Sequence, residues 1–177
     1  ADLGCGMATV ARYAAVHYPL SHLVAVTIVK KHVEMARELN QAAGLQNRIT
    51  VCHDNFEDLH LSGESITHAY AIESACHAAS AGKQKFIAEM ARILKPGGRF
   101  CIADGFLKTE KPPTGIFKWL YQKMTGYWAV PGFAGIDTFR RELEKAGLVN
   151  IKVKEISYRI APSVAYSPLV CLKFFIR

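Results

Sequence analysis

Apolar and polar residues repeat with two different periods over the first hundred residues. Residues 22–28 form an almost continuous apolar run, which is typical of a strand covered on both faces. Residues 30–43 repeat at helical spacing and are followed by Gly44, a residue that often closes a helix. Further strands are predicted at 48–53, 66–73 and 98–104, and further helices at 7–18 and 81–94. This alternation predicts a doubly wound α/β fold with a mostly parallel sheet.

The pattern changes after residue 104. Residues 105–135 contain three prolines, several glycines and a series of aromatic residues, and they are predicted to form an insertion. A helix is predicted at 136–146, ended by Gly147, and strands are predicted at 149–158 and 169–176. Two successive strands without a helix between them predict an antiparallel C-terminal strand. Because no repeat or linker is evident, residues 1–177 are predicted to form one domain.

Composition narrows the class of protein. Of the 177 residues, 50% are hydrophobic and 21% are charged, which is typical of a soluble globular domain and not of a disordered chain. The uncharged stretches are too short for a membrane span or carry Pro and Ser, and the first residues do not resemble a signal peptide. The five cysteines are widely spaced, which favours a reduced, cytoplasmic compartment over a disulfide framework or a structural zinc site.

The net charge bears on the choice of partner. Twenty-two basic and 15 acidic residues give +7, which suits an anionic ligand, a membrane surface or nucleic acid. The basic residues are spread along the chain, with only Lys30-Lys31 and Arg140-Arg141 adjacent. This distribution favours an ordinary solvated surface.

A glycine loop lies at Asp2–Ala8 (DLGCGMA), between a strand end and a helix start. Glycines at such a place let a ligand approach the backbone at the helix N-terminus. A dinucleotide-binding loop would need a glycine at Thr9 and an acid about 20 residues on, whereas residues 17–33 contain no Asp or Glu. A P-loop would need G-K-[ST], which does not follow. A turn with a purely structural role remains an alternative.

Four motifs in register resemble the class I S-adenosylmethionine-dependent methyltransferases over nearly the whole chain. Asp2–Gly6 is similar to the first motif of that family, and Val26–Ile28 stands where its second strand ends. His53–Phe56 follows the third strand, where members place an acid near adenine, and Leu94–Gly98 (LKPGG) is similar to the turn before the fifth strand. The resemblance implies a Rossmann-like methyltransferase fold, S-adenosylmethionine as cofactor and S-adenosylhomocysteine as product.

The resemblance also implies which residues hold the cofactor. Beside its methionine and ribose it places Asp2, Gly4 and Gly6, with Thr27 at the end of the second strand; beside its adenine it places Asp54, Asn55 and Phe56; along its flank it places Ile72 and Glu73.

Two residues, one in the glycine loop and one at the end of the second strand, depart from the family pattern. Ala8 replaces the third glycine of the loop, and its methyl group fits if the local backbone is ordinary helix. Thr27 replaces an acid that grips the ribose hydroxyls, and a threonine hydroxyl makes one hydrogen bond where the acid makes two. Because branches similar to sterol and tocopherol methyltransferases share this strand ending, Thr27 indicates a branch of the family.

The segment Tyr70–Ala78 (YAIESACHA) is similar to a stretch of sterol 24-C-methyltransferases and, more loosely, of tocopherol and sugar methyltransferases. Glu73 and His77 share a face if the chain is helical there, and both are predicted to be catalytic because either can accept a proton during methylation. Alternatively, Glu73 binds backbone amides and His77 caps a helix. Asp104, at the end of the fifth strand, is predicted to orient His77 or to cap a helix.

The acceptor is predicted to be a hydrophobic small molecule of the sterol, isoprenoid or quinone-like class. Related enzymes form a substrate lid at 105–135, whose apolar face suits such an acceptor and is compatible with peripheral contact to a membrane; packing on the sheet is the alternative. No nucleic-acid substrate is expected, because [DN]-P-P-[YF] and Pro-Cys motifs are absent.

Three questions stay open at this point. A sugar or natural-product O-methyltransferase with His77 as general base, or a non-catalytic cofactor-binding domain, remains an alternative function. The acceptor atom and the oligomeric state are not determined. Because Asp2 is expected to end the central strand of the fold, further residues supplying that strand and helices are expected before Ala1.

Overall fold

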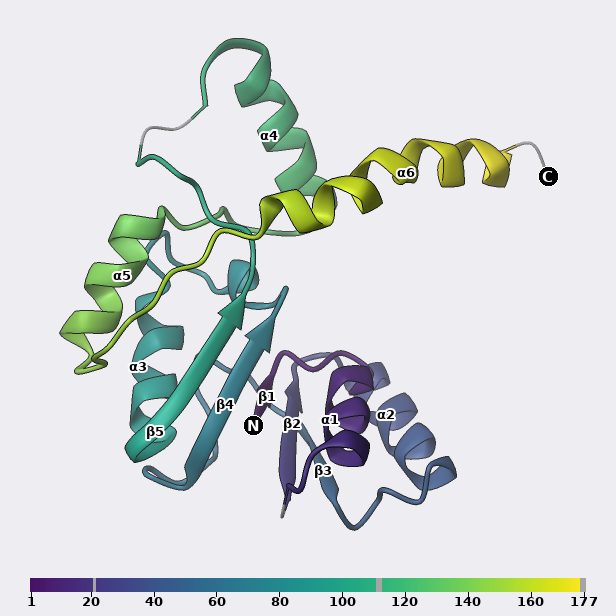
Figure 1. The fold of residues 1–177 in the computed structure, drawn as a ribbon, viewed down its shortest axis with the longest axis vertical. Helices are drawn as coiled ribbons and strands as arrows, with labels where there is room; N and C mark the ends of the chain where they lie inside the picture. Colours follow the sequence, from purple (N-terminus) through teal and green to yellow (C-terminus); the bar gives the residue numbers. More distant parts are fainter. Residues whose placement is uncertain (21, 111–112, 176–177) are drawn as a thin grey trace.

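The computed structural model describes residues 1–20, 22–110 and 113–175. Five parallel strands form one sheet in the order β3-β2-β1-β4-β5 (Figure 1). The strands are β1 (Asp2–Leu3), β2 (Leu23–Thr27), β3 (Ile49–His53), β4 (Ile66–Ile72) and β5 (Leu94–Ala103). The predicted mostly parallel sheet is therefore confirmed.

Helical segments pack on both faces of this sheet and lie beyond the carboxyl ends of its strands. They are α1 (Thr9–His17), α2 (Lys30–Ala42), the 3-10 turn η1 (Ala75–His77), α3 (Gln84–Ile93), α4 (Gly115–Tyr127), α5 (Ile136–Lys145) and α6 (Ser157–Phe175). Alternate residues of β2 point to opposite faces: Ala25 packs in a cluster with α1 and α2, and Val26 packs in a cluster with α3 and α5. Burial on both faces explains the continuous apolar run in the sequence.

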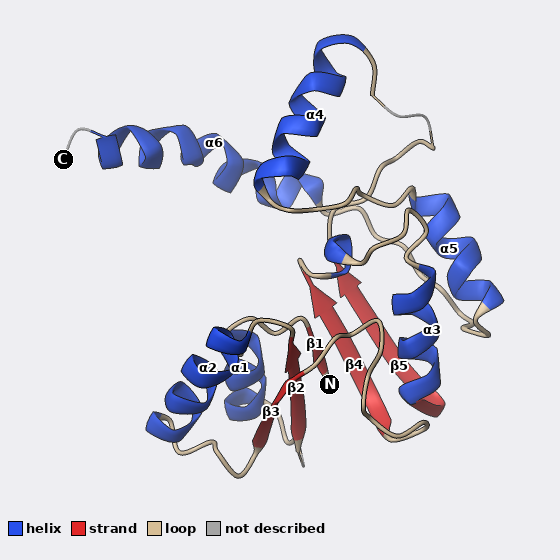
Figure 2. Ribbon diagram, turned by 180° about the vertical axis from the view of Figure 1, so that it is seen from behind, coloured by secondary structure: helices blue, strands red, loops and turns tan. Residues whose placement is uncertain are grey.

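The central strand β1 is short. Asp2 pairs with Ala25 on one side and with Tyr70 on the other, and Leu3 pairs with Val26. Within the described residues β1 lies between β2 and β4, and the Ala1 carbonyl also accepts from the Tyr70 amide at 2.9 Å. The β2–β3 and β4–β5 halves of the sheet diverge below β1 (Figure 2).

The expected antiparallel C-terminal strand is wrong. Residues 151–156 have no regular structure, and α6 occupies residues 157–175 where the second strand was predicted up to 176, a residue outside those described. An apolar run of this length is compatible with either element. A helix satisfies its own backbone hydrogen bonds, whereas a strand needs a neighbour. No described strand pairs with the outer edge of β5.

Candidate cofactor and acceptor site

The glycine loop turns tightly across the carboxyl ends of β1 and β2. The Gly4 and Cys5 amides both donate to the Val26 carbonyl, at 2.9 and 2.8 Å. Gly4 has a φ of +86°, and a Cβ atom there would overlap the Cβ of Ser74 and lie 2.8 Å from its Oγ. A Cβ at Gly6 would meet nothing within 4 Å. Gly4 is therefore needed for close packing, while Gly6 leaves the backbone open to a ligand.

Ser74, in the Tyr70–Ala78 segment, supports this loop. Its side chain is buried, and its Oγ donates to the Leu3 carbonyl at 2.6 Å. Phe56 lies on the same side, with its ring 3.6 Å from the Cβ position of Gly4 and edge-on to Phe86. We call Gly4, Ser74, Phe56 and Phe86 the glycine-loop junction. The sequence alone carries no signal for Ser74, which contacts the loop from 71 residues away.

Ala8 does not have the helical backbone under which its methyl group was expected to fit. Its φ of 56° and ψ of 33° are left-handed, and it is fully buried at the N-terminus of α1. For an L-residue this conformation costs about 1–2 kcal/mol. The third glycine of the family motif would occupy this position without that cost.

Asp2 carries its carboxylate into the middle of the sheet. It is 3% exposed, and the Tyr70 hydroxyl donates to its Oδ2 at 3.1 Å. Burial raises the pKa of Asp2 to about 6, against the smaller opposing effect of the Tyr70 hydrogen bond. Burial and the Asp2 charge also raise the pKa of Tyr70. Near neutral pH the protein thus holds a costly buried charge beside the glycine loop.

The β2 and β3 ends bring Thr27 and Asp54 together. Thr27 is buried, its Oγ1 accepts from the Val29 amide at 3.3 Å, and its carbonyl accepts from the Asp54 amide at 3.1 Å. The Asp54 carboxylate accepts from the Asn55 amide, the His60 amide and the His60 ring at 2.9, 2.8 and 3.0 Å. Burial opposes ionisation of Asp54, but these bonds lower its pKa overall. The Asp54 carboxylate therefore holds the conformation of the loop from Asn55 to His60.

The Tyr70–Ala78 segment continues from β4 into η1. Ile72, Glu73 and His77 are exposed at this end of the sheet. Glu73 has a φ of 49° and its amide donates to the Ala103 carbonyl at 2.8 Å. The helix begins only after it, so the helical alignment of Glu73 with His77 is not formed. A left-handed non-glycine residue is a strained backbone position, and such positions cluster at functional sites.

Asp104 caps the turn that carries His77. Its Oδ2 accepts from the Cys76 amide at 3.0 Å and its Oδ1 from the Gly105 amide at 2.7 Å. This geometry matches the cap that was the alternative to a direct contact with His77. Burial and the Asp104 charge raise the pKa of the Cys76 thiol to about 12. Cys76 is therefore a protonated packing residue near neutral pH.

Lys83, which the sequence does not mark, is a buried ammonium between three segments. It is 1% exposed, and its Nζ donates to the carbonyls of Cys76, Ala78 and Gly132 at 2.9, 2.6 and 2.8 Å. Burial lowers its pKa. Lys83 thus ties η1 and the start of α3 to the loop after α4. Its position before a helix would suit an exposed lysine equally well, so only the fold reveals this role.

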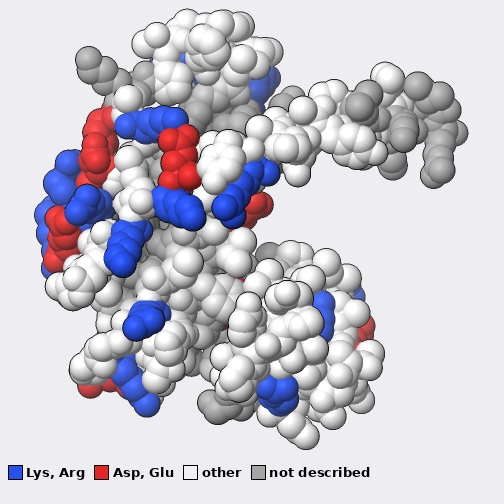
Figure 3. Space-filling model, viewed as in Figure 1, with Lys and Arg blue, Asp and Glu red and all other residues white. Residues whose placement is uncertain are grey.

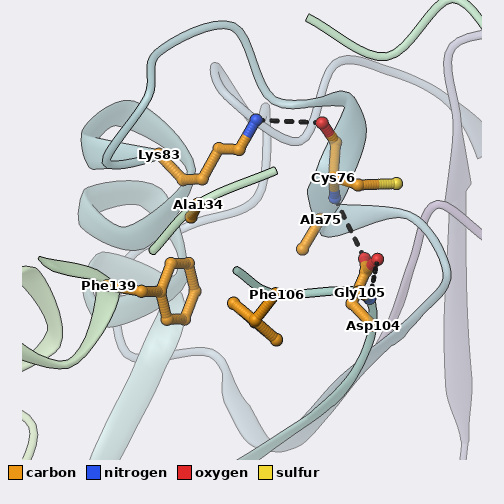
Figure 4. A pocket seen from close by; sticks show the side chains of 8 residues that line it. All are labelled: Ala75, Cys76, Lys83, Asp104, Gly105, Phe106, Ala134 and Phe139. Carbon is orange, nitrogen blue, oxygen red and sulfur yellow. Dashed lines mark hydrogen bonds between the residues drawn. The ribbon is translucent and has the colours of Figure 1, made fainter. Parts of the chain in front are cut away.

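A small hollow lies next to Lys83 (Figure 4). Its volume is about 170 Å³, including open space at its mouth. Its lining combines a polar edge with apolar side chains, and comprises Ala75, Cys76, Lys83, Asp104, Gly105, Phe106, Ala134 and Phe139. It contains none of the glycine-loop residues, so we do not assign the cofactor to it.

The edge formed by the glycine loop, Thr27 and the 54–56 loop fits the cofactor that the resemblance implies. It offers open backbone at Gly6 and a buried carboxylate on Asp2. It also offers exposed apolar side chains on Met7 and Ile28, to which the sequence assigned no role of their own. Among residues 1–20, 22–110 and 113–175, no group of three or more His, Cys, Asp or Glu side chains is placed to hold a metal ion.

Comparison with known sequences finds one matching protein family and similar curated proteins. The methyltransferase-domain family matches residues 1–98, more than half of the chain. The chain is 39% identical over 99 residues to 24-methylenesterol C-methyltransferase 2 of Oryza sativa subsp. japonica, covering 56% of this chain and 26% of that protein. It is 32% identical over 182 residues to an S-adenosyl-L-methionine-dependent Diels-Alderase of Talaromyces variabilis, covering 97% and 60%. The chain thus spans less than two thirds of either relative.

The fold is similar to that of geranyl diphosphate C-methyltransferase from Streptomyces coelicolor A3(2), solved with Mg²⁺, geranyl diphosphate and S-adenosyl-L-homocysteine. The TM-score is 0.73 at 18% identity, and the match covers 84% of this chain and 52% of that one. This likeness confirms the predicted Rossmann-like fold.

Proposed function

Because the chain belongs to the methyltransferase-domain family, we propose that it transfers a methyl group from S-adenosylmethionine to a hydrophobic small molecule of the sterol, isoprenoid or quinone-like class. The observation that carries the proposal is Ser74 packed beneath Gly4. This contact fixes the cofactor loop against the Tyr70–Ala78 segment, which is similar to that of sterol methyltransferases. The 39% identity to a rice 24-methylenesterol C-methyltransferase supports the same acceptor class.

Each element of the edge has a role in holding the cofactor. Gly4 and Gly6 bring the backbone close to its methionine part, and Asp2 supplies a buried carboxylate nearby. The Asp54–Phe56 loop and exposed Ile28 border the adenine, while Thr27 and Ile72 lie along the ribose and the flank. When bound, S-adenosylmethionine supplies an electrophilic methyl group on a sulfonium.

Orientation of the two reactants for in-line transfer is the main contribution of the protein. His77 accepts a proton from a hydroxyl acceptor, or Glu73 accepts one from a methylated carbon. Asp104 and Lys83 are positioning residues, because they hold the backbone of the turn that presents His77. Residues 105–135 cover the acceptor as a lid, and Lys83 anchors that lid at Gly132.

Calorimetry with S-adenosylmethionine tests the cofactor assignment. We expect binding by the unaltered chain and loss of binding in Gly4→Ala, while Gly97→Ala, a second left-handed glycine with no neighbour within 4 Å, keeps it. Circular dichroism confirms that both variants fold. Absence of binding by the unaltered, folded chain would contradict the proposal.

A methyl-transfer screen across sterols, prenyl quinones, phenols and sugars tests the acceptor. We expect S-adenosylhomocysteine to form with an apolar acceptor and turnover to fall about 10²–10⁴-fold in His77→Ala if His77 is the base. Preference for a sugar would overturn the acceptor class while leaving the cofactor assignment intact. Unchanged turnover in both His77→Ala and Glu73→Gln would remove these residues from catalysis.

A second candidate function is cofactor-dependent cyclisation without methyl transfer. It is favoured by the match of 97% of this chain to an S-adenosyl-L-methionine-dependent Diels-Alderase. In that case the cofactor binds, a diene substrate is consumed, and no S-adenosylhomocysteine forms. Measuring the two products in one assay separates the candidates.

A further inference from the structure

The positive charge of this protein is concentrated in two segments. Residues 111–136 contain three lysines and no Asp or Glu, and residues 156–177 contain three basic residues and no Asp or Glu. Together they contribute six of the seven net positive charges of the chain. The remaining residues are almost neutral in sum. The basic side chains that the structure describes in these two segments are those of Lys118, Lys123 and Arg159.

The same segments expose large apolar side chains. On α4 and the residue that follows it, the exposed side chains are those of Ile116, Phe117, Trp119, Leu120, Tyr127 and Trp128. On α6 they are those of Tyr158, Ile160, Val164, Tyr166, Val170 and Leu172. Phe117 is 69% exposed and Tyr127 is 82% exposed, so this face does not pack on the sheet. We call these side chains, with Lys118, Lys123 and Arg159, the α4–α6 surface.

Few contacts hold α4 to the rest of the molecule. The Tyr121 hydroxyl accepts from the Phe133 amide at 2.9 Å, and Thr125 is the only buried residue of α4. Both α4 and α6 lie beyond the carboxyl ends of the strands, on the side of the proposed site (Figure 1). The visible surface of α4 is almost free of acidic residues, whereas both signs of charge gather over α5 (Figure 3).

We propose that the α4–α6 surface docks on the surface of a lipid bilayer that contains anionic lipids. Trp and Tyr favour the membrane–water interface, apolar side chains insert below the headgroups, and Lys and Arg are attracted to anionic lipid. Among the described helices, none is long and apolar enough to cross a bilayer. Docking there places the proposed acceptor site next to a store of hydrophobic molecules.

Charge distinguishes this occupant from the alternatives. A second copy docked through the same surface would oppose cation to cation with no acid to pair, which disfavours association. Single-stranded nucleic acid is bound by a basic groove with aromatic platforms, whereas here the cations are few and widely separated by apolar residues.

Vesicle binding tests the proposal without any methyl transfer, so its failure is distinct from failure of the proposed function. Trp119 and Trp128 are the only two tryptophans of the chain, and both lie on the α4–α6 surface. We expect their fluorescence to shift to the blue on vesicles of phosphatidylcholine with phosphatidylserine, and the protein to float with them. On phosphatidylcholine alone, or at high salt, we expect weaker binding.

Two variants with matched controls locate the contact. Phe117→Ser/Leu120→Ser should weaken partition by more than about tenfold, whereas Val16→Ser/Tyr18→Ser, equally exposed on and after α1, should not. Lys118→Gln/Lys123→Gln should weaken it by roughly 20- to 30-fold, and Lys30→Gln/Lys31→Gln should have little effect.

Three results would overturn the proposal. They are absence of binding to anionic vesicles, equal loss in the control variants, and a dimer in sedimentation that Phe117→Ser/Leu120→Ser dissociates while vesicles remain unbound. Circular dichroism shows whether each variant is folded, independently of the proposed function.

Discussion

The glycine-loop junction and the α4–α6 surface differ in how far their side chains are buried and find partners within the described chain. At the junction, Ser74 and Phe86 are buried and the Ser74 hydroxyl has its partner inside the protein. On the α4–α6 surface, aromatic and aliphatic side chains of similar size remain in contact with solvent. The junction is completed by internal packing, which suits a site that must hold a cofactor rigidly. Within the part of the chain that the structure describes, the large apolar side chains of the α4–α6 surface remain exposed, which suits the proposed bilayer contact.

Truncating one phenylalanine in each region gives the largest contrast. Phe86→Ala should lower the free energy of unfolding by about 3–5 kcal/mol, because it leaves a cavity in a fully buried cluster. Phe117→Ala should change it by less than about 0.5 kcal/mol. Denaturant unfolding of the two variants measures the difference. A similar loss for both would show that α4 packs internally.

Lys83 lies at the boundary between the two regions. Lys83→Met leaves three buried carbonyl groups without a donor, and we expect unfolding to become easier by about 3 kcal/mol. Lys85→Met, on the exposed side of α3, is the matched control. If Lys83 also positions the turn of His77, the acceptor KM and kcat of folded Lys83→Met change while cofactor affinity does not.

Comparing Gly4→Ala with Gly97→Ala separates the steric overlap with Ser74 from the backbone strain of a positive φ. We expect a loss of about 2–3 kcal/mol, because the new Cβ overlaps Ser74 and φ is positive. Gly97→Ala carries the positive φ without the overlap and should lose about 1 kcal/mol. The double variant Gly4→Ala/Ser74→Gly should regain part of the difference. No recovery in thermal unfolding would assign the whole effect to strain.

Asp2→Asn should stabilise the protein by about 2–3 kcal/mol above pH 6. Burial raises the pKa of Asp2 from 3.8 to about 6, so the native state binds more protons than the unfolded state between these values. The unfolding free energy therefore falls as pH rises from about 4 to 6 and is then level, and Asp2→Asn removes that fall. Below pH 4 the two proteins should agree. Gain of stability with loss of cofactor binding would mark Asp2 as a functional charge; an unchanged profile would contradict its burial as an ion.

Much of the parallel sheet can be predicted because its signal is local. The apolar run of β2 and the helical spacing of α2 each lie within a dozen residues or so, and burial on both faces produces them directly. The prediction for the C-terminal segment is wrong because its signal is not local: an apolar run does not reveal whether a neighbouring strand exists to pair with it. Residues 157–175 are accordingly helix where strand was predicted.

The sequence by itself determined the order of strands and helices up to residue 104, the glycine loop and the resemblance to a methyltransferase family, because periodicity and motif spacing are properties of neighbouring residues. Only the tertiary structure decided that Ser74 closes Gly4, that Lys83 is buried, and that Ala8 is left-handed. Ser74 and Leu3 are 71 residues apart, and Lys83 and Gly132 are 49 apart. Contacts at such separations exist only when the sheet is assembled, and their strength depends on the burial that assembly creates.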